Sequence, residues 1–220
     1  MGNLDTVIAI IAATGGLGLA AMSLVDALKA IPGGGVSKIG FNHILDATRR
    51  FADVLKQATG DDWSTVLLSH WINGRPRTEQ IGVIRSLLRL GLNAETAPQL
   101  ATVGNVDAGK LAKVAEKLVA GQDMTEEELN LLGRAEAAVE ARLDAAFDLA
   151  DQAYRNKSRV IAGLLAVLLS LGAALAIGRG EDWALAIVIG VLAVPIAPIT
   201  KDLVSALTAA ANAVKSTRKP

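Results

Sequence analysis

The chain has 220 residues, of which 51% are hydrophobic and only 3% aromatic, and its 22 basic and 22 acidic side chains cancel to a formal charge of zero. The apolar excess comes from Ala, Leu, Val and Ile rather than from aromatic residues, which favours an all-α fold over a β-rich or disordered chain. The absence of Cys excludes disulfides, a thiol nucleophile and Cys-ligated metal centres.

Three stretches without a charged side chain are each about as long as a bilayer core is thick: residues 6–25, 160–178 and 183–200. Core helices of soluble proteins rarely run this far without a charge. The third stretch contains Pro195 and Pro198, which packed membrane helices tolerate. Residues 1–5 carry an acid and no Lys or Arg, which favours an uncleaved anchor over a signal peptide. We therefore predict an integral membrane protein with three transmembrane helices.

Charges beside these stretches predict the orientation. Arg155, Lys157 and Arg159 precede the second stretch and Lys201 follows the third, whereas the link at 179–182 has one basic and two acidic residues, a net charge of minus one. Positive flanks stay on the cytoplasmic side. We expect a multi-pass protein of a bacterial cytoplasmic (inner) membrane, with the N-terminus and the link outside and the C-terminus in the cytoplasm.

The segment between the first two stretches reads as a cytoplasmic helical domain. A glycine-rich hinge at 31–35 precedes a helix predicted over 41–58, a short helix that Asp62 caps and that runs to residue 71, and a helix over 78–90, the last two forming an αα-hairpin. Weaker signals predict a helix over 93–103, and Asp107 caps another over 108–120.

A single long helix is predicted over 125–178, running from the cytoplasmic domain into the second transmembrane stretch. Thr125 and Glu128 have capping-box spacing, and no proline interrupts the segment. An apolar seam of coiled-coil type follows the cap: Leu129, Leu132, Val139, Leu143, Ala146, Ala150 and Ala153. The predicted parts are thus residues 1–32 (first transmembrane helix), 33–124 (cytoplasmic helical domain), 125–178, 179–200 (external link and third transmembrane helix) and 201–220, an amphipathic tail.

Charge is segregated within the cytoplasmic part. Residues 123–151 hold nine acids against two arginines, whereas the hairpin carries four arginines against Glu79. These are Arg75, Arg77, Arg85 and Arg89. They form a candidate electrostatic interface for the acidic helix, within or between subunits, or for anionic lipid. The alternative is two independently solvated faces, because surface ion pairs contribute little.

Small residues recur about one turn apart in all three stretches, a spacing that lets helix backbones approach closely. The candidate helix-packing residues are Ala12, Gly16, Ala20, Ala162, Ala166, Ser170, Ala174, Gly178, Ala186, Gly190, Ala193 and Ala197. The spacing does not distinguish packing within one subunit from packing between subunits, and of the two we expect a homo-oligomer. Thr14, Ser170 and Thr200 are candidate pore-lining residues, although hydroxyls at such positions commonly bond to helix backbone. No stretch has an internal acid or base, which argues against a proton relay.

One short motif suggests nucleotide chemistry. Residues 104–110 fit G-x-x-x-x-G-K and resemble the phosphate-binding loop of P-loop GTPases, but Leu111 stands where that loop needs Ser or Thr, and no buried strand precedes it. We predict a turn between helices there. His43 and His70 have no helical neighbour that would complete a metal site. We predict no catalytic, cofactor-binding or metal-binding residue and no enzyme activity.

The predicted layout is similar to that of the TolQ and ExbB family of stators, and residues 189–195 (Ile-Gly-Val-Leu-Ala-Val-Pro) resemble the Gly and Pro pattern of that family's third span. The family's Gly-rich second-span motif and its pore threonine are not found. The resemblance implies an oligomer that houses helices of a partner membrane protein. Expected partners are the bilayer, copies of the chain and another membrane protein, with no nucleic acid.

Three hypotheses for function follow from these patterns. The first is a non-enzymatic oligomeric scaffold or channel-like complex. The second is a pore-forming effector of the holin or defence type, in which the cytoplasmic helices control the pore. The third is a nucleotide-dependent membrane enzyme, which depends on the imperfect phosphate loop at 104–110.

Overall fold

A computed structural model describes residues 2–28, 31 and 35–217, with side chains described at 6, 9–28, 31, 35–202 and 205–206. All regular elements in these residues are helical, as predicted, and none of them forms a strand. The chain divides into two compact units. We call residues 32–154 the helical domain, and residues 1–31 together with 155–220 the three-helix unit.

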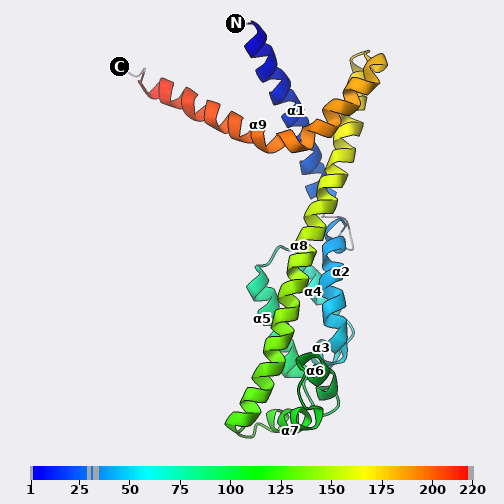
Figure 1. Ribbon diagram of the computed structural model, residues 1–220, viewed down its shortest axis with the longest axis vertical. Coiled ribbons are helices and arrows are strands. Elements are labelled where there is room, and N and C mark those ends of the chain that lie inside the picture. The colour runs from blue at the N-terminus through cyan, green and yellow to red at the C-terminus, as the bar shows by residue number, and fades with distance from the viewer. Residues whose placement is uncertain (1, 29–30, 32–34, 218–220) are drawn as a thin grey trace. The chain divides into compact units, whose positions relative to one another are not determined.

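The helical domain consists of short helices and the first part of one long helix (Figure 1). The elements are α2 (Ser37–Thr48), η2 (Arg49–Phe51), α3 (Ala52–Thr59), α4 (Trp63–Ile72), α5 (Arg77–Gly91), α6 (Ala97–Gly104), α7 (Ala108–Val119) and α8 (Glu126–Ala176). The predicted helix over 41–58 is divided in two by η2. Phe51 has a non-helical backbone there (φ −133°, ψ 32°), and its side chain is fully buried.

Large side chains fill the core of the helical domain. Phe51, Leu88, Leu143 and Phe147 are at most 2% exposed. The predicted seam of α8 faces this core, with Leu132, Val139, Leu143, Ala146 and Ala150 buried, but its first member, Leu129, is 52% exposed. Because α3 and α5 pack backbone to backbone, a Cβ at Gly91 would overlap the carbonyl oxygen of Val54.

Two predicted N-terminal caps are confirmed. The Asp107 carboxylate accepts a hydrogen bond from the Lys110 amide at 2.7 Å, which caps α7. Before α8, the Thr125 amide donates to Glu128 Oε2 (2.8 Å) and the Glu128 amide donates to Thr125 Oγ1 (3.3 Å). These reciprocal bonds form a capping box. Asp62, also predicted as a cap, precedes α4 without a side-chain capping bond.

The three-helix unit contains α1 (Gly2–Ala27), the rest of α8, η3 (Gly180–Asp182) and α9 (Trp183–Thr217). Among the described residues, three helices are long and apolar enough to cross a membrane: they contain Ala9–Ala27, the apolar part of Glu126–Ala176, and Gly180–Asp202. α1 crosses α9 (Figure 1), and α9 is bent, as expected for a helix with Pro195 and Pro198 inside it.

Small residues form the core of the three-helix unit. Ala21, Ala162, Ala166 and Ala193 are at most 1% exposed and pack together. Large apolar side chains cover the outside, such as Leu168 with 64% exposure. Other exposed members are Leu164, Val188, Val191 and Leu192. This distribution fits a membrane-embedded protein, because large apolar side chains on the outside suit a lipid solvent.

The end of α8 differs from the sequence prediction. α8 ends at Ala176, two residues early, because Gly178 adopts a left-handed backbone (φ 74°) and the Arg179 amide bonds back to the Ala174 carbonyl at 2.8 Å. α9 continues from the third stretch into the predicted amphipathic tail and ends at Thr217. Side chains 203–204 and 207–217, in the predicted amphipathic tail, are not among those described, and neither are hinge residues 32–34.

Candidate functional site

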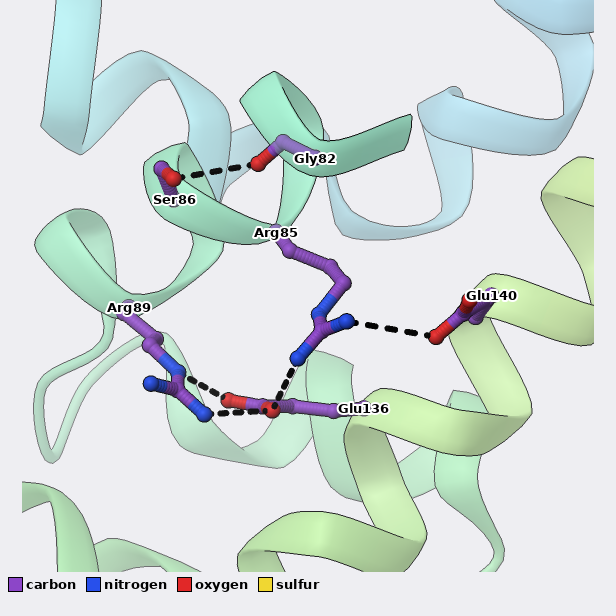
Figure 2. A network of polar contacts seen from close by, with 6 residues as sticks. All are labelled: Gly82, Arg85, Ser86, Arg89, Glu136 and Glu140. Carbon is purple, nitrogen blue, oxygen red and sulfur yellow. Dashed lines mark hydrogen bonds and ion pairs between the residues drawn. The ribbon is translucent and has the colours of Figure 1, made fainter. Parts of the chain in front are cut away.

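A row of ion pairs joins α5 to α8 inside the helical domain (Figure 2). Arg89 holds Glu136 through two contacts, Nε to Oε1 at 2.5 Å and Nη2 to Oε2 at 2.8 Å. Arg85 lies between two acids, 3.7 Å from Glu136 and 3.5 Å from Glu140. The Glu136 side chain is only 7% exposed, and the carboxylate raises the pKa of Arg89 through hydrogen bonding and charge attraction.

The row continues at the beginning of α5. Arg77 donates to Asp144 Oδ1 (2.8 Å), to the Asp144 carbonyl (2.5 Å) and to Asp148 Oδ1 (2.6 Å), and its guanidinium lies 6.0 Å from the centre of the Phe147 ring. Burial opposes the charge on Arg77, but the two carboxylates outweigh it and raise the pKa of Arg77. The acids Glu136, Glu140, Asp144 and Asp148 are spaced four apart, so they form one stripe on α8.

Three of the four predicted interface arginines therefore contact the acidic helix within one chain. Arg75 is exposed and joins no ion pair among the described residues; its carbonyl accepts a hydrogen bond from Gln80 at 2.7 Å. A further contact, not predicted from the sequence, links α7 to the start of α8, where Lys117 Nζ lies 2.8 Å from Glu128 Oε1. Lys117, together with the capping amide of Thr125, lowers the pKa of Glu128.

The small-residue ladders of the second and third stretches lie mostly inside the three-helix unit. Ala162, Ala166, Ser170, Ala186, Gly190, Ala193 and Ala197 are buried, Ala174 is half-buried, and Gly178 is exposed beyond the end of α8. A Cβ at Gly190 would approach the Val167 backbone too closely. These residues thus let α9 pack tightly on its neighbours within the chain.

The ladder of α1 faces elsewhere. Ala12, Gly16 and Ala20 are exposed, and a Cβ at Gly16 would contact nothing within 4 Å. The contact with α9 uses the neighbouring face, where a Cβ at Gly15 would overlap Thr200 and one at Gly18 would overlap the Ala193 carbonyl. The sequence signal for that face was present in the spacing of Gly15, Gly18 and Ala21, but it overlaps the other ladder.

The three hydroxyls singled out in the sequence are all buried in the three-helix unit. Thr200 Oγ1 donates to a backbone carbonyl, with Ile11 O at 3.2 Å and Ile196 O at 3.3 Å. Thr14 and Ser170 instead line a groove of about 400 Å³ formed by α1, the end of α8, and the start of α9. Thr200 thus stabilises helix packing, while the other two hydroxyls border an open space.

The phosphate-loop match is a turn between helices, as predicted. Residues before Gly104 form α6 rather than a strand, and Asn105 has a left-handed backbone (φ 50°). Lys110 Nζ lies 4.0 Å from Glu127 Oε1. His43 lies on α2 and His70 on α4. Within the described part of the chain, no three His, Asp or Glu side chains gather as metal ligands would.

Comparisons of the chain with models of known protein families, with curated proteins and with solved structures found no match.

Proposed function

We propose that this protein is a non-enzymatic, multi-pass membrane protein that assembles into an oligomeric scaffold or channel-like complex. The observation that carries the proposal is the distribution of side chains in the three-helix unit, with alanines such as Ala166 inside and leucines such as Leu168 outside. In water this arrangement would expose a large apolar patch, which soluble monomers rarely tolerate. In a bilayer the same side chains face acyl chains.

The exposed ladder of Ala12, Gly16 and Ala20 supports assembly. Small-residue faces allow close helix contact, and this one has no partner helix among the described residues of its own chain. A second copy is the occupant that we propose. The ion pairs between α5 and α8 then serve to hold each helical domain together rather than to join subunits, because the arginines are already engaged within the chain.

The subunit count in lipid nanodiscs, measured by native mass spectrometry, tests the assembly. We expect a defined oligomer for the natural chain and fewer subunits for Gly16→Ile, whose side chain separates the helices. A matched control is Leu24→Ile on the same helix, which keeps an exposed aliphatic side chain. A monomeric natural chain would contradict the proposal.

The proposed location is a bacterial inner membrane, with the N-terminus and the link at 179–182 outside and the helical domain in the cytoplasm. The positive flanks of the second and third stretches support this orientation. Because the chain has no Cys, single cysteines are unique labels. In intact bacterial cells with a permeabilised outer membrane, a membrane-impermeant maleimide should label Glu181→Cys and leave Gln122→Cys unlabelled until the inner membrane is opened. The reverse pattern would invert the topology.

Liposomes that contain only this protein distinguish a silent scaffold from a pore. A scaffold that needs a partner gives no ion flux, whereas flux from the purified chain would favour the pore-forming effector. Activity that requires nucleotide and is lost in Lys110→Ala would favour the enzyme hypothesis.

A further inference from the structure

The groove in the three-helix unit has the size and lining of a ligand site. Its volume of about 400 Å³ lies within the usual range for small-molecule pockets. Nine of its thirteen lining residues are apolar, contributed by α1, α8 and α9. These are Ile10, Ala13, Leu17, Ala173, Ala174, Ile177, Leu185, Ala186 and Ile189. An aliphatic chain is the ligand that such a lining favours.

Charged groups of both signs complete the lining. Arg179 and Asp182, from the link that joins α8 to α9, both border the groove, and Arg179 Nε lies 2.9 Å from Asp182 Oδ2. Their side chains remain accessible, with 68% and 37% exposure. A guanidinium is a strong donor to phosphate oxygens, and a carboxylate accepts from an ammonium group. One ligand that carries both head-group charges can therefore contact both residues.

We propose that this groove binds one acyl chain of a zwitterionic aminophospholipid, with the lipid phosphate on Arg179 and its primary ammonium group on Asp182. The inference rests on the proposed membrane location. Charge complementarity selects the lipid class: Arg179, Glu181 and Asp182 give the link a net charge of minus one, which disfavours a lipid with a net negative charge. A choline head group lacks an N–H to donate to Asp182.

Titration of the full-length protein with lipids, followed by native mass spectrometry, tests the head group. Phosphatidylethanolamine, phosphatidylcholine and phosphatidylglycerol with identical acyl chains are the probes. We expect phosphatidylethanolamine to bind about tenfold more tightly than phosphatidylcholine, the effect of one hydrogen bond to a charged group. Equal binding of all three lipids would overturn the proposal.

Two variants separate the ammonium contact from the charge of the link. Asp182→Asn should abolish the preference for phosphatidylethanolamine over phosphatidylcholine. Glu181→Gln is the matched control, because it changes the link charge equally but removes a carboxylate that does not line the groove. It should keep that preference. If both variants lost the preference for phosphatidylethanolamine, selectivity would depend on the net charge of the link alone. That result would overturn the proposed contact between Asp182 and the ammonium group.

A third variant tests the acyl chain. Ser170→Leu fills the groove from α8 and should weaken retention of all three lipids, whereas Leu168→Met, on the exposed side of α8, should leave retention unchanged. Unchanged retention in Ser170→Leu would overturn the proposed acyl site. A chain that enters nanodiscs without lipid preference contradicts this inference alone. A chain that fails to enter them contradicts the membrane location as well.

Discussion

The two units of this protein place their large apolar side chains in opposite positions. In the helical domain, residues such as Leu88 and Phe147 are inside and most charged side chains are outside, Glu136 being an exception; in the three-helix unit, alanines such as Ala166 are inside and residues such as Leu168 are outside. Both arrangements occur on α8, which contributes to both units. The cores of the two units are therefore stabilised by different residue types, large apolar side chains in the helical domain and small residues in the three-helix unit. Water drives leucine inward in one, whereas close backbone packing admits only small residues in the other.

Removing a buried leucine should lower the stability of the helical domain more than removing an exposed one. Leu88→Ala leaves a cavity in the helical domain and should lower its free energy of unfolding by about 2–5 kcal/mol. Leu168→Ala, at a residue 64% exposed, should leave the stability of that domain unchanged. Urea unfolding followed by fluorescence of Trp63 and Trp71 in a Trp183→Phe background reports on the helical domain alone. Equal losses in both variants would contradict the inverted arrangement.

A charge on an exposed leucine should affect only the three-helix unit. Leu168→Asp, near the middle of the second apolar stretch, should oppose membrane insertion by about 2.5–3.5 kcal/mol, because the bilayer core does not solvate a carboxylate. Leu129→Asp, at a residue 52% exposed in the helical domain, should leave insertion and folding unchanged. Carbonate extraction of membranes measures the difference. Normal insertion of Leu168→Asp would show that this face does not contact lipid.

The ion pairs between α5 and α8 should contribute less than the apolar core. Glu136→Gln removes the carboxylate that contacts Arg85 and Arg89, and should lower the free energy of unfolding of the helical domain by about 1–2 kcal/mol, since both arginines remain partly solvated. Glu140→Gln, which loses one contact of 3.5 Å at a half-exposed side chain, is the control with a smaller effect. The urea midpoint of each variant is compared with that of the natural chain. Midpoints equal to that of the natural chain would show that the row of ion pairs does not stabilise the helical domain.

Acid should produce the smallest effect, at the junction of α7 and α8. Lys117 and the Thr125 amide lower the pKa of Glu128 below its ordinary value of 4.5. The resulting stabilisation is present above the pKa of the unfolded chain and is lost as the pH falls through the lower pKa of the folded chain. The drop in urea midpoint between pH 7 and pH 3 should therefore be smaller in Glu128→Gln than in the natural chain. An equal drop would show that this pair does not stabilise the fold.

Local sequence rules predicted much of the helical architecture. Thr125, Glu128 and Asp107 form the expected caps because a capping bond depends only on residues within one turn. The break at Phe51 could not be predicted, because it depends on how deeply that ring enters a core built from distant residues. The acidic stripe was visible in its spacing of four, but which arginine meets which acid depends on the register between α5 and α8.

The candidate sites in the three-helix unit were only partly predictable. Small-residue spacing identified Ala166 and Ala193, which pack inside the unit. On α1 the same rule offered two overlapping faces, and nothing local distinguishes Gly15 from Gly16. For Arg179 and Asp182, the sequence indicates only their charge. Their position beside the groove depends on the end of α8 at Gly178 and on the packing of α1, which no local pattern encodes.

The adjacent glycines Gly15 and Gly16 lie about 100° apart around the axis of α1, because an α-helix has 3.6 residues per turn. Gly15 is pressed against Thr200 of its own chain, whereas Gly16 faces away from it. Bulky substitutions at these two positions should therefore differ in whether they act as recessive or dominant alleles. Bulky alleles at 15 would misfold, be degraded and behave as recessive. If subunits meet at the face that contains Gly16, a chain with a bulky residue at 16 would still fold and join natural subunits in mixed complexes. Such an allele would act as dominant.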